Sequence, residues 1–284
     1  MKVDQIWMHP VKSMVGQTVD SARLDELGLI GDRIWAVRDL ESGGIRGAKK
    51  LGGLMTLSAR RLDPSARGHD DPVEIEFPDG RRVTSDDPDV DALLSEELGR
   101  RVSLQHLRPA EDLDHYRRGR PDSDDVMGEL RSIFGREADE PLPDLTQFPP
   151  VIMEFESPPG TYYDCWPLMV MTTSALRSLA DAVPDSIVDV RRFRPNFVID
   201  TDDQPGHPEF TWTGRRAVVG EAEIEFIGPC PRCVMVTRAV GSDLPEDRAM
   251  LRHVVRELDQ NVGAYARVTR EGRFSVGDPL TFVD

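Results

Sequence analysis

The chain has 284 residues, 39% of them hydrophobic, and a formal net charge of −16 at pH 7. This length suits one large domain or two small ones, and we expect two. The acidic excess argues against nonspecific nucleic-acid binding, because phosphate backbones are attracted by basic surfaces. No apolar run reaches membrane-spanning length, and the start turns polar before a signal-peptide core forms, so we expect no membrane segment and a reducing, cytoplasmic location.

The first hundred residues have the composition of short β-strands separated by glycine turns. One helix is predicted over about 88–99, because it follows an Asp-Asp-Pro start and carries leucines at helical spacing. Residues 1–107 are therefore predicted to form a small, mainly antiparallel β domain. The predicted strands of this part are 2–8, 34–38, 55–58, 73–77 and 102–106.

Residues 108–160 differ in composition from the chain on either side. They contain acidic runs at 122–125 and 137–140, many prolines and one short amphipathic helix near 124–134. This pattern predicts a long connection or an insertion. Such a segment could cover a site as a lid, and its composition is equally compatible with a disordered spacer.

Ordered structure is predicted again from the apolar run at 168–171 to the end of the chain. Threonines and a serine at 172–174 are good helix caps, so a helix is expected over 174–182. A second helix is expected over 245–258, where apolar residues recur at helical spacing. The fold class that follows is mainly β with several helices (α+β). The strands predicted here are 196–200, 217–219, 222–227, 233–239, 264–269 and 280–283.

Cys230 and Cys233 form a Cys-x-x-Cys pair with Arg232 between them. A thiolate is a soft metal ligand and a strong nucleophile, and a cation in the same turn lowers its pKa. Cys165 is far away in sequence and no two histidines have the short spacing of zinc sites, which disfavours a structural zinc. A redox dithiol needs a helix after its first cysteine, whereas 233–239 is predicted as a strand. Two half-buried structural thiols remain an open alternative.

Three other polar groups are candidates for a site. Arg194 and Asn196 belong to an arginine-rich run before a predicted strand, where guanidinium and amide groups could bind an anionic ligand. Lys12 and Ser13 lie at a strand end, and Asp164 lies at the edge of the second domain. Each group is also compatible with a simpler role, as a surface charge or in turn chemistry.

Taken in order, segments along nearly the whole chain resemble the MOSC family, named for the molybdenum cofactor sulfurase C-terminal domain. The resemblance is to its two-part form, in which an N-terminal β-barrel precedes the MOSC domain. It is similar in layout to the mitochondrial amidoxime-reducing component and bacterial relatives. The resemblance implies two β-barrel-like domains, at 1–107 and 161–284, with 108–160 between them. The segments that carry it are 6–13 (IWMHPVKS), 28–35 (GLIGDRIW), 48–50 (AKK), 192–196 (RFRPN), 220–233 and 276–279 (VGDP).

The resemblance also assigns roles to residues. Cys233 is implied to hold the molybdenum of a pterin cofactor, the molybdopterin form of the molybdenum cofactor. Asp164 is implied near the metal, where we expect it to deliver protons as a catalytic residue. Lys49 stands where relatives of the mitochondrial enzyme carry an arginine, so it would act as a point charge. The residues implied to bind the cofactor are Lys12, Ser13, Lys49, Arg194, Asn196 and Arg232.

The function implied is a molybdenum-cofactor-dependent oxidoreductase that reduces N-hydroxylated or related N–O small-molecule substrates. The chain has no ferredoxin-type cysteine run and no dinucleotide fingerprint, so separate electron-donor proteins are expected as partners. One alternative is a carrier that binds the molybdenum cofactor, or a sulfur atom on Cys233, without turnover of its own. Another is a thiol redox protein that uses Cys230 and Cys233.

Overall fold

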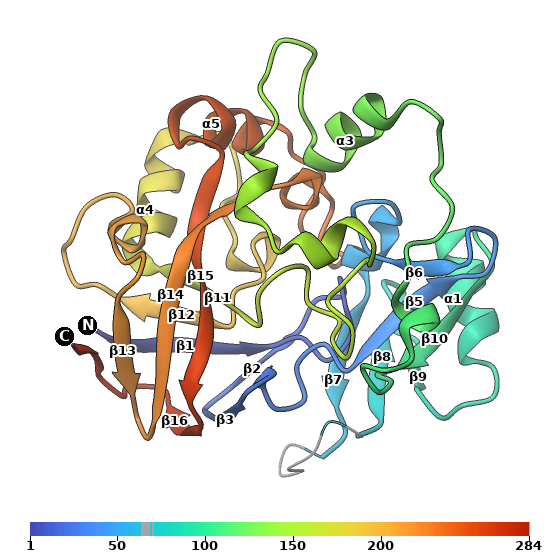
Figure 1. Ribbon diagram of the computed structural model, residues 1–284, viewed down its shortest axis with the longest axis horizontal. Coiled ribbons are helices and arrows are strands. Elements are labelled where there is room, and N and C mark those ends of the chain that lie inside the picture. Colours follow the sequence, from blue (N-terminus) through green and yellow to red (C-terminus); the bar gives the residue numbers. More distant parts are fainter. Residues whose placement is uncertain (64–68, 70, 284) are drawn as a thin grey trace.

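The computed structural model describes residues 1–63, 69 and 71–283, and its fold is mainly β with several helices (Figure 1). The strands are β1 (Lys2–Met8), β2 (Gln17–Val19), β3 (Ser21–Asp25), β4 (Gly28–Leu29), β5 (Trp35–Asp39), β6 (Gly44–Arg46), β7 (Ser58–Arg61), β8 (Val73–Glu76), β9 (Arg82–Thr84), β10 (Val102–His106), β11 (Leu168–Thr172), β12 (Phe197–Asp200), β13 (Arg216–Val219), β14 (Ala222–Pro231), β15 (Asn261–Arg270), β16 (Gly272–Ser275) and β17 (Leu280–Val283). The α-helices are α1 (Val90–Leu98), α2 (Leu113–Tyr116), α3 (Val126–Phe134), α4 (Thr173–Ala182) and α5 (Ala249–Glu257). The 3₁₀ helices are η1 (Gly52–Thr56), η2 (Leu145–Gln147), η3 (Pro150–Met153), η4 (Val190–Arg192), η5 (Pro208–Thr211) and η6 (Val234–Thr237).

The largest sheet has eight strands in the order β17-β13-β14-β15-β11-β12-β1-β2. Its neighbours pair antiparallel except β11 and β12, which are parallel. Although β1 begins the chain, it pairs with β12, with Ile6 opposite Phe197. The N-terminal strand therefore completes the sheet of the C-terminal half. The predicted domain limits stay a prediction. The pairing of β1 with β12 joins strands on the two sides of the limit predicted at residue 107.

Three smaller sheets complete the molecule. The order β10-β5-β6 and the order β7-β8-β9 belong to the N-terminal half, whereas β16 joins β3 and β4 in a sheet made from both halves. The core of the N-terminal half, around Leu54 and Leu94, also includes Val240 and Leu244 from the C-terminal half. Each half thus contributes side chains or strands to the other.

Local sequence explains most of the elements. Burial alternates along the first part of β14, as expected for a strand with one face in the core. In α5 the apolar residues at helical spacing are the buried ones. The hydroxyl of Thr172 accepts a hydrogen bond from the backbone N–H of Ala175 and caps α4, as predicted from the sequence.

Two predicted strands were wrong. Residues 52–56 form the 3₁₀ helix η1, and the strand predicted at 55–58 begins only at Ser58. The strand predicted over 233–239 is instead the 3₁₀ helix η6, whose Val236 and Thr237 are buried. Strand β14 runs on to Pro231, and packing of η6 near α5 outweighs the β propensity of its valines and threonine.

The segment 108–160 is folded and lies between the two halves (Figure 1). Tyr116 and Phe155 pack with Ala36 and Ile45 of the N-terminal half in one apolar cluster. On the other side, Arg136 donates hydrogen bonds to the side chain of Gln260 at 2.8 Å and to the backbone oxygen of Arg232 at 3.1 Å. These contacts support the covering arrangement over the disordered spacer. None of the helices in the described part of the chain has the length and hydropathy needed to cross a bilayer.

Candidate functional site

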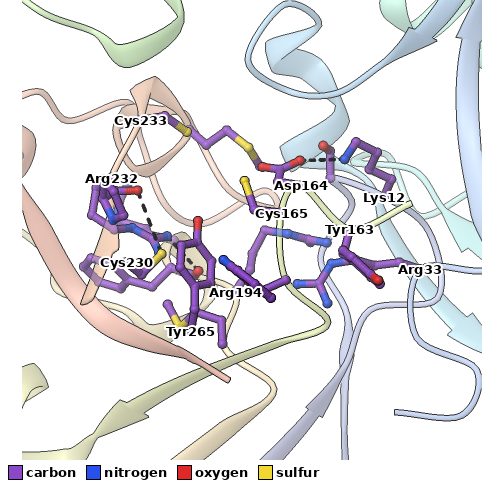
Figure 2. Close-up of a pocket in the computed structure, with 17 residues that line it drawn as sticks. Lys12, Arg33, Tyr163, Asp164, Cys165, Arg194, Cys230, Arg232, Cys233 and Tyr265 are labelled. Atoms are coloured by element: carbon purple, nitrogen blue, oxygen red, sulfur yellow. Dashed lines mark hydrogen bonds and ion pairs between the residues drawn. The ribbon is translucent and has the colours of Figure 1, made fainter. Parts of the chain in front are cut away.

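A pocket of about 680 Å³, counted out to open solvent, lies where the two halves meet (Figure 2). The loop after β1 contributes two of its lining residues and the loop before β5 contributes one. The rest come from the chain before β11 and its first residues, from the turn before β12, from the end of β14 and the start of η6, and from β15. The predicted residues that line it are Lys12, Ser13, Asp164, Arg194, Arg232 and Cys233. Residues far apart in sequence are thus brought together around the cysteine pair.

The three cysteines are free thiols in different surroundings. All three line the pocket, but Cys233 is half-buried, whereas Cys165 and Cys230 are only 8% and 3% exposed. Burial, followed by the nearby carboxylate of Asp164, raises the pKa of Cys165 to about 12. Among these thiols Cys233 is the one open to a ligand.

Arg232 donates a hydrogen bond to Cys230, a contact that was not predicted from the sequence. Its Nη1 donates to the Sγ of Cys230 at 3.1 Å, and its Nη2 donates to the backbone oxygen of Phe193 at 2.8 Å. Through these two hydrogen bonds, Arg232 connects the end of β14 to the turn before β12. Cys233 is the next residue in the chain.

Buried cations surround the pocket, and two of them have unused donors. Lys12, Arg194 and Arg232 are 4%, 6% and 8% exposed. Nη2 of Arg194 and Nε of Arg232 are buried without a hydrogen-bond partner in the described chain. Burial, followed by repulsion from Arg33, lowers the pKa of Arg194 to about 9. Since an unpartnered buried guanidinium is unfavourable, this donor set suits an anionic ligand such as a phosphate.

Three residues that line the pocket have left-handed backbones although they are not glycines. These are Ser13 with φ 71°, Arg33 with φ 51° and Arg194 with φ 57°. Such conformations cost about 1–3 kcal/mol each and tend to occur at functional sites. The hydroxyl oxygen of Ser13 also accepts a hydrogen bond from the backbone N–H of Ala48 at 2.9 Å, which fixes this loop beside the loop of Lys49.

Asp164 is held between two lysines. Its carboxylate lies 2.6 Å from Nζ of Lys12 and 2.9 Å from Nζ of Lys49. Burial opposes ionisation of this carboxyl, but the two lysines outweigh it and hold its pKa well below the usual range. In Lys49 burial works to lower the pKa, but the charge of Asp164 and other nearby acidic groups outweigh burial and raise the pKa above its usual value. Asp164 is therefore an ionised carboxylate in this pocket, and its expected role in proton delivery stays a prediction.

Asn196 does not line the pocket. It is fully buried, its oxygen accepts from the backbone N–H of Met169 at 3.1 Å, and its nitrogen donates to Asp32 at 3.2 Å. Asp32 in turn pairs with Arg33. The geometry makes Asn196 a support for the Asp32–Arg33 pair, and its predicted contact with a cofactor stays a prediction.

Among the lining residues that sequence reasoning missed are Arg33 and Tyr265. Arg33 belongs to the segment 28–35, which carries part of the family resemblance, so that motif could have identified it. Tyr265 had no sequence signal, because pairing of β14 and β15 places it opposite Gly228, near the cysteine pair. Burial, followed by the thiol of Cys230, raises the pKa of Tyr265 well above its usual range, so this phenol stays protonated.

No cluster of three or more His, Cys, Asp or Glu side chains that could hold a metal ion occurs in residues 1–63, 69 and 71–283. The pocket combines one half-buried thiol, that of Cys233, with a set of buried cations. This arrangement fits a group with a single protein thiolate ligand and an anionic arm.

Comparison with known proteins gives matches in both halves of the chain. The model of the MOSC N-terminal beta barrel domain matches residues 1–109, and the model of the MOSC domain matches residues 158–281. Mitochondrial amidoxime reducing component 2 of Macaca fascicularis is 28% identical over 131 residues, which span 42% of this chain and 38% of that protein. The same component of Bos taurus is 24% identical, and the match covers 98% of this chain and 82% of that protein.

Two solved structures are also similar. The YUAD protein of Bacillus subtilis has 12% identity and a TM-score of 0.45, and the match covers 99% of this chain and 94% of that one. YiiM of Geobacillus stearothermophilus has 16% identity and a TM-score of 0.32, and the match covers 42% of this chain and 55% of that one.

The family conclusion rests on the two domain models, which match in the same order as the sequence segments described above. They place the chain in the MOSC family, as a protein with a MOSC N-terminal beta barrel domain followed by a MOSC domain.

Proposed function

We propose that this protein is a molybdenum-cofactor-dependent oxidoreductase that reduces N-hydroxylated or related N–O compounds. The observation that carries the proposal is the half-buried thiol of Cys233 beside buried cations whose donors lack partners. Membership of the MOSC family and the similarity to amidoxime reducing components support it. The overall reaction joins the substrate N–OH, two electrons and two protons to give the N–H product and water.

Each residue around the pocket has a proposed task. Cys233 would hold the metal through its thiolate, and the cofactor, when bound, would supply the two-electron redox chemistry. Arg194 and Arg232 would bind the anionic arm with their unpartnered donors, and Ser13 would assist from its strained loop. Asn196 would act indirectly, through Asp32 and Arg33.

Asp164 and the two lysines would organise the metal end of the pocket. As an ionised carboxylate, Asp164 would fix Lys12 and Lys49 and could receive a proton there. The phenol of Tyr265 remains protonated, so it can donate a hydrogen bond, which the ionised carboxylate of Asp164 cannot. Electrons would come from separate donor proteins, and we propose a cytoplasmic setting for them.

The test is metal analysis of three proteins made in a host that produces the cofactor. Molybdenum content and pterin fluorescence after oxidation are measured on wild type, Cys233→Ala and Cys230→Ala, together with anaerobic reduction of N-hydroxybenzamidine by reduced methyl viologen. We expect near-stoichiometric molybdenum and turnover in wild type, loss of both in Cys233→Ala, and retained metal in Cys230→Ala.

Other outcomes would point to the alternatives. Absence of metal and pterin from all three proteins would overturn the proposal. Metal that wild type transfers to an apo-enzyme, without reducing any N–O compound itself, would indicate a carrier. A thiol redox protein would instead lose its disulfide reductase activity equally in both cysteine variants.

A further inference from the structure

A second, larger cavity opens beside Cys233 on the side of the segment 108–160. Its void is about 2040 Å³, counted out to open solvent, and it shares five lining residues with the cysteine pocket. The shared residues are Asp164, Cys165, Pro231, Cys233 and Tyr265. This space, which we call the apolar groove, is therefore continuous with the proposed reaction centre.

Apolar side chains of α3, η2, η3 and the loops around them form the walls of the groove. No residue of α3 is buried, although the helix is amphipathic. Val126 is 66% exposed and Met153 is 72% exposed, and both line the groove together with Leu130, Phe134, Phe148 and Ile152. Exposed apolar side chains gathered around a cavity are typical of a binding site, so these walls suit an apolar ligand.

The charged residues on the walls are already paired within the chain. Lys50 lies 2.6 Å from Glu129 and Arg118 lies 2.5 Å from Glu156, measured between nitrogen and oxygen atoms. Lys49 is bound to Asp164 in the same way, and Arg46 is paired with Asp122. A charged ligand would have to compete with these pairs, whereas a neutral one leaves them intact.

We propose that the apolar groove binds the neutral, hydrophobic body of the substrate and directs its N–O group to Cys233. This inference rests on the proposed function, and it names the substrate class as neutral N-hydroxylated compounds with an extended aryl or alkyl body. Small polar N-hydroxylated compounds would gain nothing from the groove. Burial of each additional phenyl ring is expected to raise kcat/KM about tenfold.

The groove is tested by two exposed double variants matched in charge. In the groove variant Val126→Glu is combined with Met153→Glu. In the control variant Met127→Glu is combined with Ile187→Glu, because these residues are 53% and 54% exposed and neither lines the groove. All four positions are exposed, so both variants are expected to fold like wild type, which circular dichroism checks.

The first readout is binding of the neutral apolar fluorophore N-phenyl-1-naphthylamine to the full chain. We expect saturable binding to wild type, an approximately tenfold weaker affinity in the groove variant and unchanged affinity in the control variant. Equal affinity in all three proteins overturns the inference, whether or not any turnover is seen. This readout is independent of the redox reaction.

The second readout is turnover of N-hydroxyacetamidine, N-hydroxybenzamidine and N-hydroxybiphenyl-4-carboxamidine under reduced methyl viologen. In wild type kcat/KM should rise along this series, and the groove variant should lose the rise whereas the control variant keeps it. A flat series in wild type, or an equal loss in the control variant, contradicts the inference. No turnover of any member refutes the proposed function instead, and the fluorophore then decides the groove.

Discussion

Asp164 shows how one side chain can determine the charge state of a whole pocket. It is the common partner of Lys12 and Lys49, and Lys12 also donates to the backbone oxygen of Tyr162 at 2.8 Å. The pair with Lys12 is nearly closed to water on the lysine side, whereas the carboxylate side chain is 38% exposed. This partial exposure reduces the strength of the interaction below that of a fully buried pair.

We therefore predict that Asp164→Asn lowers the free energy of unfolding by about 1–2 kcal/mol at pH 7, a value discounted for solvent screening. Because the pKa of Asp164 is depressed in the folded state, the stabilisation is present above the usual carboxyl pKa and is lost as the pH falls below it. Urea denaturation from pH 8 to pH 3 should show a constant difference down to about pH 5 and a smaller one below pH 4. A difference that changes between pH 5 and pH 8 would rule out this assignment. Glu225→Gln, which breaks the surface pair with Arg267, is the control and should have little effect.

At the scale of elements, the junction between β14 and η6 separates the two cysteines of the pair. The strand ends at Pro231, so Cys230 is still part of the sheet and buried, whereas Cys233 stands just before the 3₁₀ helix and faces the pocket. Pro231, which has no N–H to donate, is the last residue of the strand. The spacing of the motif thus becomes a difference in accessibility.

From this difference we predict that iodoacetamide at pH 8 modifies Cys233 at least about tenfold faster than Cys230 or Cys165 in the native protein. Cys230 is shielded, and Cys165 stays protonated because its pKa is about 12. Peptide mass spectrometry over time measures the three rates, and Cys233→Ala should leave only slow labelling. Labelling of Cys230 as fast as Cys233 would instead support a paired dithiol.

Local patterns predicted the elements whose burial follows from their own sequence. The helix α1 and the strand β10 were found close to their observed limits, because leucine spacing and β-rich composition are local signals. The run 233–239 was mistaken for a strand because its conformation depends on where β14 ends and on packing near α5. Neither can be inferred from the composition of the run. Similarly, motif resemblance found Lys12 and Arg194, whereas Tyr265 reaches the pocket only through the register of β14 and β15.

At the scale of the whole molecule, the two halves share sheets and cores. Strand β1 lies in the sheet of the C-terminal half, β16 pairs with β3, and Leu244 packs in the core of the N-terminal half. The segment 108–160 adds contacts to both sides. The family models match two successive stretches of the chain, residues 1–109 and 158–281, but sequence composition carried no information on this exchange of strands.

We predict that the two halves unfold as one cooperative unit. Ile6→Ala removes a fully buried side chain of the large sheet and should cost about 2–5 kcal/mol. Native-state hydrogen exchange should show an equal loss of protection in β5 and in β13. Leu94→Ala, in the core of the N-terminal half, serves as the reciprocal change and should lower protection in β13 as well. A loss confined to the mutated half would show that the halves unfold independently.

The pairing of β1 with β12 also governs the order of events at the ribosome. Lys2 leaves the exit tunnel early, but its partner Asp200 is made almost two hundred residues later. At typical synthesis rates of about 5–20 residues per second, roughly 10–40 s separate the two strands. During this interval β1 can pair with β2, but its other edge, which later pairs with β12, is without a partner strand. The loop of Lys12 and Ser13 is fixed beside Arg194 only after β12 is made, and Cys233 follows later still, so any ligand of this pocket binds only after both halves of the site have been synthesised.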